Sequence, residues 1–152
     1  MGNLLKIFFL SAVPLIEQRG SIPIGVIVYS IHPMTVFLVC FVGSMLPVPF
    51  ILLLFNRIFE WMQRYKAFDS FSNFIQKKLD KNSDKMEKYK EIGLITFIAI
   101  PLPTTGVWTG TAVAAFLELD FKKSVICAVI GGLISATVIT VISILLPSFF
   151  GY

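Results

Sequence analysis

Two long apolar segments, residues 33–56 and 124–150, constrain this chain more than any other feature of its sequence. An α-helix needs about 20 apolar residues to cross a bilayer, and both segments reach that length. Hydrophobic residues make up 56% of the chain and charged residues 14%, whereas an ordinary soluble domain has about 25% charged residues. The sequence therefore predicts one all-α integral membrane domain over residues 1–152, in the plasma or inner membrane.

Four shorter apolar segments occur as two pairs, residues 4–16 with 22–31 and residues 92–103 with 107–117. As a helix, each would cover only about half of the hydrocarbon thickness. Two arrangements fit this pattern. Each pair either fuses into one kinked span, which gives four spans, or enters and leaves on the same side as a re-entrant hairpin.

The positive charges favour the hairpins. In that arrangement eleven of the thirteen Lys and Arg residues share one side, because only Lys6 and Arg19 lie elsewhere. Four spans would place Lys122 and Lys123 on the opposite side. Positively charged loops face the cytoplasm, so we expect a cytoplasmic connector at residues 61–91 and both termini outside.

The two halves of the chain resemble each other. A shift of 87 positions superimposes Pro14 on Pro101 and Cys40 on Cys127, and the order of segments repeats. Because one span separates the copies, the second is upside down, which predicts an inverted repeat of two re-entrant helical hairpins, each followed by a transmembrane helix. The predicted parts are repeat 1 (1–60), the connector (61–91) and repeat 2 (92–152).

The connector has the pattern of an amphipathic helix. Phe68, Phe71 and Phe74 recur at helical spacing among lysines and acidic residues. We expect this segment to lie on the cytoplasmic membrane surface and contact anionic lipid.

A stripe of small residues marks the last span. It contains Ala128, Gly132, Ala136 and Thr140, at intervals of four. Small residues let another helix approach closely, so this stripe predicts packing against residues 33–56 or a homodimer contact.

The most informative loop is Pro14-Leu-Ile-Glu-Gln-Arg-Gly-Ser-Ile-Pro23, because Glu17 and Arg19 lie at bilayer depth. A buried charge there costs about 2.5–3.5 kcal/mol and usually has a function. Pro14 and Pro23 disrupt helix, and Gly20 permits a turn. We therefore expect a non-helical loop that presents both charges to one cavity. Arg19 is expected to bind an anion and Glu17 to titrate. The alternative is a structural ion pair.

The second loop, residues 101–110, is uncharged. Its hydroxyls can either satisfy backbone groups freed by proline or complete the same cavity, with Trp108 as a wall. The candidate binding residues here are Thr104, Thr105, Trp108 and Thr109, and the candidate loop-forming residues are Pro101, Pro103, Gly106 and Gly110.

Other classes of function find no support in the sequence. It has no metal-ligand spacing, nucleophile triad or phosphate loop, so we expect neither an enzyme nor a cofactor. The net charge of +4 is concentrated in one stretch, which indicates membrane orientation rather than binding to nucleic acid.

Both loops resemble those of the small multidrug export protein family of bacterial and archaeal membrane proteins. The matching residues are Glu17-Gln-Arg-Gly-Ser-Ile-Pro23 and Pro101-Leu-Pro-Thr-Thr-Gly-Val-Trp-Thr-Gly110. That family is similar in layout to the DedA (SNARE-associated, VTT) superfamily. The second resemblance implies facing re-entrant hairpins, functional weight on Glu17 and Arg19, and lipid translocation coupled to protons.

The leading hypothesis is a transporter or flippase for an anionic amphiphile, a polyprenyl phosphate or a phospholipid. Arg19 would bind the headgroup and Glu17 would couple to protons. Two alternatives stay open: a proton-coupled small multidrug exporter, and a membrane scaffold that docks partners on residues 60–91.

Overall fold

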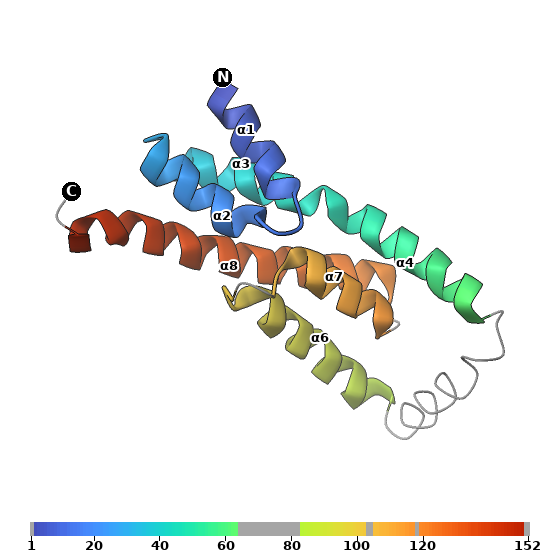
Figure 1. The fold of residues 1–152 in the computed structure, drawn as a ribbon. Helices are drawn as coiled ribbons and strands as arrows, with labels where there is room; N and C mark the ends of the chain where they lie inside the picture. The colour runs from blue at the N-terminus through green and yellow to red at the C-terminus, as the bar shows by residue number, and fades with distance from the viewer. Residues whose placement is uncertain (1, 64–82, 103–104, 118, 151–152) are drawn as a thin grey trace.

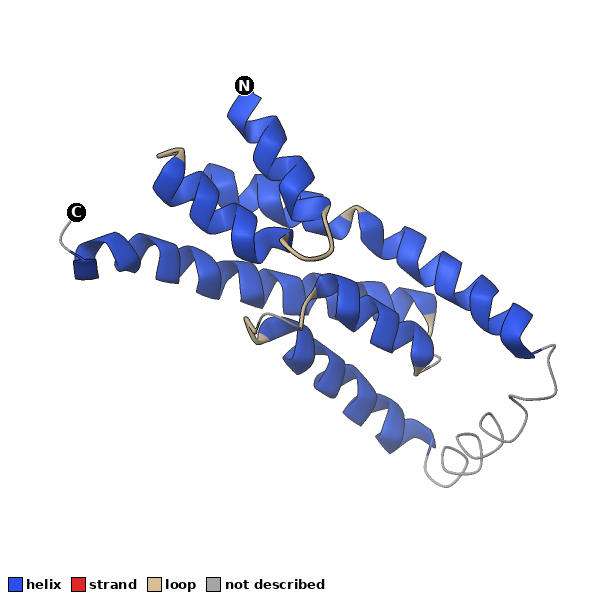
Figure 2. Cartoon of the chain, viewed as in Figure 1, coloured by secondary structure: helices blue, strands red, loops and turns tan. Residues whose placement is uncertain are grey.

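A computed structural model of the protein describes residues 2–63, 83–102, 105–117 and 119–150. These residues form helices joined by short loops, without a strand among them (Figures 1 and 2). The predicted all-α class is confirmed. In chain order the elements are α1 (Gly2–Ala12), α2 (Glu17–Pro23), the π-helix η1 (Ile24–Val28), α3 (Pro33–Met45), α4 (Pro47–Gln63), α6 (Ser83–Ala99), α7 (Val107–Phe116) and α8 (Phe121–Phe150).

Two stretches of the described chain are long and apolar enough to cross a membrane: Pro33–Phe55, which covers α3 and part of α4, and Phe121–Leu146 in α8. In the most apolar part of each, only 44% and 39% of the residues are buried by the rest of the protein. Core helices of a soluble protein would be mostly covered. These two stretches instead leave much of their apolar surface available to lipid.

The break between α3 and α4 follows from proline. Pro47 has no N–H to donate to the carbonyl of Gly43. The N–H of Leu46 donates to that carbonyl instead, at 3.4 Å. The chain then continues as α4 in nearly the same direction (Figure 1).

Two helical hairpins flank the long helices. The first consists of α1 and of α2 with η1, and it packs on α3 and α8. The second consists of α6 and α7, and it packs on α8 and α4. The hairpins lie at opposite ends of α8, and their loops approach each other near its middle (Figure 1).

The interior has two apolar clusters, and α8 contributes to both. Ala136 and Ile139 of α8 pack with Ile7, Ile22 and neighbouring residues of the first half. Further along the same helix, Cys127 and Ala128 pack with residues of α6 and α7 and with Val48 and Leu52 of α4. Because α4 and α8 each reach into the other half's cluster, the two halves interlock.

The small-residue stripe of α8 packs inside the chain. Ala128, Gly132, Ala136 and Thr140 are all buried. A Cβ placed on Gly132 would come within 2.7 Å of Met45 Cε, so glycine here lets α8 approach α3 closely. The predicted contact with residues 33–56 is present, and the homodimer stays a prediction.

Large apolar side chains also cover the outside. Phe9 is 65% exposed, Leu15 92% and Phe50 67%. Monomeric soluble proteins rarely expose apolar surface on this scale, which agrees with a membrane location.

The helices overlap the predicted apolar segments, but their bounds differ. The segment 33–56 is divided between α3 and α4, α4 continues to Gln63, and α6 begins at Ser83, nine residues before the predicted start at residue 92. Two predictions depend on residues outside the described ranges: the amphipathic connector and the scaffold hypothesis. Both rest on Phe68, Phe71 and Phe74, which lie outside the described residues. Because α6 begins at Ser83, residues 83–91 belong to the helix that enters the second half. The inverted repeat and the re-entrant path stay predictions.

Candidate functional site

The loop around Glu17 is shorter than expected, because α2 begins at Glu17 itself. The expectation of a non-helical segment through Pro23 is therefore wrong. Pro23 removes a single donor, the one for the Arg19 carbonyl, and the helix continues through it into η1. The sharp turn is made at Glu17, whose φ of 45° lies in the left-handed region.

The Glu17 carboxylate caps the N-terminus of α7. Its Oε1 accepts a hydrogen bond from the backbone N–H of Trp108 at 2.8 Å, and its Oε2 accepts one from Val107 at 3.3 Å. Glu17 is only 4% exposed. The first N–H groups of a helix have no partner within it and carry partial positive charge. A carboxylate stabilises them both by accepting their hydrogen bonds and by its negative charge.

Gly106 makes this approach possible. A Cβ built at this position would lie 2.3 Å from Glu17 Oε2. Any side chain at residue 106 would push the carboxylate away from α7. The sequence had marked Gly106 only as a loop-forming residue.

Arg19 caps the C-terminus of α6, at the other end of the loop that joins α6 to α7. Its Nη2 donates to the carbonyls of Ile100 at 3.1 Å and Ile98 at 3.4 Å, and its Nη1 donates to the carbonyl of Leu102. Cations are favourable at helix C-termini, where free carbonyls carry partial negative charge.

Each of the two charges therefore binds a helix end of the opposite partial charge. Glu17 bonds to the positive end of α7 and Arg19 to the negative end of α6, on either side of the loop that joins them. Interactions of this kind contribute about 0.3–1 kcal/mol each at exposed sites and about 2 kcal/mol when partly buried. Both charges come from the first half of the chain, and the two helix ends that they cap lie in the second half.

One hydrogen bond joins a side chain of the second half to a helix end of the first half. The indole N–H of Trp108 donates to the carbonyl of Ala12 at 3.1 Å, and Ala12 is the last residue of α1. Each hairpin thus closes a helix end of the other. Trp108, which was predicted to be a cavity wall, therefore serves as a hydrogen-bond donor between the hairpins.

Gln18, between the two charges, is a further contact residue that the sequence analysis missed. It is 1% exposed. Its side-chain N–H donates to the carbonyl of Gly132 in α8 at 3.0 Å, and its Oε1 accepts from the Ser44 hydroxyl of α3 at 3.3 Å. A primary amide has two N–H donors and one acceptor oxygen, and all of them need partners when the residue is buried. The position of Gln18 between two apolar segments was the signal that could have identified it.

The threonines of the second loop serve the backbone. The Thr105 hydroxyl donates to the carbonyls of Ile100 at 2.7 Å and Leu102 at 3.3 Å. The exposed Thr109 donates to Gly106 at 3.4 Å. These hydroxyls bond to carbonyls of their own loop, two of which also accept hydrogen bonds from Arg19. They are not the carbonyls of residues 97 and 99, whose helical donors Pro101 and Pro103 remove. Thr104 and Pro103 lie outside the described residues.

The remaining candidates lie away from the contact between the charges and the second loop. Gly20 packs against Ile16, and Gly110 packs against Ile98. Pro14 and Pro101 are exposed on the loops, and Pro23 is half-buried within the helical run. In the described part of the chain, no three His, Cys, Asp or Glu residues are grouped so that they could hold a metal ion.

Comparison with known protein families matches residues 17–138 to the family described as "Putative small multi-drug export protein". The match includes both Glu17–Pro23 and residues 101–110, the segments on which the resemblance was based, so this resemblance is confirmed. No curated protein matches the chain. No solved structure matches it either, and the likeness to the DedA superfamily stays a prediction.

Proposed function

Because the chain belongs to this small multi-drug export family, we propose that it is a membrane exporter of small amphipathic compounds, driven by protons that bind Glu17. One observation carries the proposal. The buried Glu17 carboxylate joins the two halves of the chain through its hydrogen bonds to the N-terminus of α7. A titratable group at such an interface can couple protonation to relative movement of the halves.

The coupling follows from competition for the same oxygen atoms. A charged carboxylate is a strong acceptor for the N–H groups of Val107 and Trp108, whereas a protonated carboxyl has lost its charge and one acceptor site. Proton binding therefore weakens the contact between α2 and α7. Proton release restores it, so the two protonation states favour two arrangements of the hairpins.

The proposed membrane layout has two re-entrant hairpins whose loops meet at mid-depth, with α3–α4 and α8 as the spans. Three features support it: the length of the hairpin helices, the position of both loops near the middle of α8 (Figure 1), and the exposed apolar side chains. In this inverted repeat, transport proceeds as the hairpins alternately part on either side of the Glu17–α7 contact.

An anionic amphiphile is a weaker candidate for the cargo. That hypothesis required a free Arg19 fork to hold a headgroup. Both terminal nitrogen atoms of Arg19 donate to backbone carbonyls of residues 98, 100 and 102. Backbone carbonyls already take three of the five N–H donors of Arg19, and its Nε, which has no partner, is buried. Export of compounds without a phosphate group is therefore the better-supported function.

Transport in liposomes tests the proposal. The purified protein is reconstituted, a pH gradient is imposed, and movement of ethidium across the membrane is followed by fluorescence. Glu17→Gln keeps a hydrogen-bond acceptor of the same shape but cannot titrate. We expect the wild type to move ethidium and this variant to fall to the rate of empty liposomes.

Glu91→Gln is the matched control. Glu91 forms a partly exposed ion pair with Lys123 at 3.2 Å, away from the α2–α7 contact. We expect its transport rate to equal that of the wild type. Transport by Glu17→Gln at the full rate, or wild-type liposomes no faster than empty ones, refutes proton coupling through Glu17.

A further inference from the structure

Gln18 joins α2 to α3 and to α8 at one point. Its Nε2 donates to the carbonyl of Gly132 in α8 at 3.0 Å, and its Oε1 accepts from the Ser44 hydroxyl of α3 at 3.3 Å. Ser44 shares its single proton with the carbonyl of Phe41 at 2.8 Å, so the bond to Gly132 is the stronger of the two. Since a carbonyl has two acceptor sites, Gln18 binds α8 without breaking its helical hydrogen bonds.

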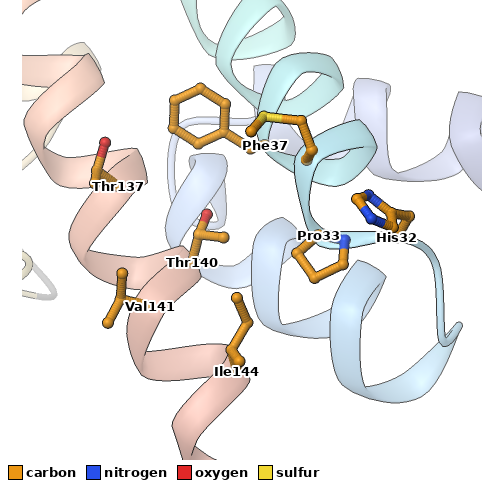
Figure 3. A pocket seen from close by; sticks show the side chains of 8 residues that line it. His32, Pro33, Phe37, Thr137, Thr140, Val141 and Ile144 are labelled. Carbon is orange, nitrogen blue, oxygen red and sulfur yellow. The ribbon is translucent and has the colours of Figure 1, made fainter.

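Gly132 lies where α2, α3 and α7 meet α8. A Cβ built on it would come within 2.7 Å of Met45 Cε in α3 and 3.5 Å of Val107 Cγ2 in α7. Further along, a cavity of about 450 Å³, with Thr140 among the side chains around it, separates the start of α3 from α8 (Figure 3). Gln18 therefore bonds to these two helices where they touch, not where they are separated.

The same face of α2 continues as apolar packing on α3 and α8. Ile22, one turn after Gln18, is fully buried in the cluster that contains Val36 of α3 and Ala136 of α8. Gly25, one turn later in η1, approaches so closely that a Cβ would lie 2.6 Å from Val36 Cγ1. Positions 18, 22 and 25 follow the spacing of one helix face, so this face is held on α3 and α8 throughout.

The first turn of α7 is held in a different way. Its N–H groups bond to Glu17, and the Trp108 indole bonds to α1. The hydroxyls at positions 109 and 111 donate to carbonyls of their own hairpin. Within the described part of the chain, the hydrogen bonds of residues 107–111 therefore lead to the first hairpin or stay within the second. The contact of Val107 with α8 at Gly132 is apolar, and apolar contacts are non-directional.

Glu17 and Gln18 are adjacent but respond differently to protons. Successive residues of a helix point about 100° apart, which directs Glu17 to α7 and Gln18 to α3 and α8. A carboxylate loses an acceptor site when it is protonated, whereas an amide keeps its donors and its acceptor. The bonds of Gln18 therefore persist when those of Glu17 weaken.

We propose that Gln18 is a positioning residue, which holds α2 on α3 and α8 while proton binding to Glu17 releases α7. This inference rests on the proposed function and adds which part moves. The first turn of α7 moves along its apolar contact with α8, and α2 stays fixed as the element from which it separates.

Distances between spin labels test which helix moves. One protein carries Ile27→Cys with Ile126→Cys and reports on the helical run α2–η1 relative to α8. The other carries Val113→Cys with Leu145→Cys and reports on α7 relative to α8. These four positions are exposed and the two native cysteines are buried, so the label reacts at the introduced residues. Each full chain is measured in lipid nanodiscs by pulsed electron paramagnetic resonance, with Glu17 and with Glu17→Gln as the uncharged form.

With Gln18 present, we expect Glu17→Gln to shift the Val113–Leu145 distance by about 2–5 Å, the range of helix shifts in switching proteins. The Ile27–Ile126 distance should stay unchanged. Gln18→Leu removes both bonds at similar size, so Glu17→Gln should then shift the Ile27–Ile126 distance as well. With Glu17 in place, Gln18→Leu should lower ethidium transport about fivefold, the change expected for the loss of one hydrogen bond.

Ser143→Ala is the matched control. Ser143 is a buried residue of α8 whose hydroxyl donates to Ile139 in the same helix. Both distances and the transport rate should equal those of the wild type. The same displacement of Ile27–Ile126 in this variant as in Gln18→Leu would refute a specific role of Gln18.

The outcomes separate this inference from the proposed function. An Ile27–Ile126 distance that shifts as far as Val113–Leu145 with Gln18 present refutes the fixed α2 and leaves proton coupling standing. No shift in either pair refutes coupling through Glu17 and the inference with it. Neither result needs a change at Gln18, so both are decisive if Gln18→Leu fails to fold. An Ile27–Ile126 distance that stays fixed in a folded Gln18→Leu overturns the role of Gln18.

Discussion

The Glu17 carboxylate lies 2.8 Å from the backbone N–H of Trp108, so a residue of the first hairpin caps a helix of the second. Trp108 in turn donates its indole N–H to the end of α1. The two hairpins are therefore joined by hydrogen bonds to helix ends as well as by apolar packing. This relationship determines which substitutions should separate them.

Gly106→Ala should destabilise the protein. The new Cβ would lie 2.3 Å from Glu17 Oε2 and would displace a charged acceptor from two buried N–H groups, which costs about 1.5–3 kcal/mol. Thermal unfolding in detergent measures the loss. Gly93→Ala in α6 is the control, since a Cβ there has nothing within 4 Å. Equal melting temperatures for the two variants would contradict the close contact at Gly106.

Arg19→Ala should loosen the end of α6. The substitution leaves the carbonyls of residues 98, 100 and 102 without the guanidinium, and we expect a loss of about 2–3 kcal/mol. Arg19→Lys should recover only part, because an ammonium cannot span carbonyls as a planar fork does. Hydrogen exchange of residues 96–102 reports the effect. The exposed Arg57 provides the control, and Arg57→Ala should leave exchange there unchanged. Wild-type protection in Arg19→Ala would show that the cap contributes nothing.

Thr140→Val should stabilise the protein by about 1 kcal/mol, because it replaces a buried hydroxyl that lacks a partner with a methyl group of the same shape. Thr137→Val, one turn earlier, is the comparison. Its hydroxyl already donates to Leu133, so we expect a change within about 0.5 kcal/mol. Thermal unfolding of ligand-free protein in detergent distinguishes them. A loss of stability in Thr140→Val would mean that its hydroxyl has a partner.

Topology reporters should separate the two membrane layouts. Re-entrant hairpins place Lys81 and Tyr152 on opposite sides of the membrane, with Lys81 in the cytoplasm. Reporter fusions at these positions, active on one side only, read the location directly. Reporters active on the same side would establish four spans and remove the inverted repeat.

The helices could be predicted from the sequence because their causes are local. The apolar segments 33–56 and 124–150 fixed the long helices, and the prolines at positions 14, 101 and 103 marked the loops. Local reasoning failed at Pro23, where the chain stays helical. The loss of one donor is small beside the packing of Ile22, fully buried in the first apolar cluster.

The site was predicted in its residues but not in its contacts. Glu17, Arg19 and Trp108 stood out because polar groups at bilayer depth need partners. Which partners they find depends on bonds that join residues about 80–100 positions apart. Helix ends as partners for both charges, the bond of Gln18 to α8, and the cavity at Thr140 all arise from that long-range packing.

The crossed caps also bear on biosynthesis. The first hairpin is synthesised long before residues 98–108, and until then Glu17 and Arg19 lack the backbone groups that neutralise them. Two unpartnered charges are costly in hydrocarbon. In the proposed re-entrant layout, we therefore expect the nascent first half to stay in contact with water or with the insertion machinery until the second half emerges, so that the protein completes its entry into the membrane as a unit.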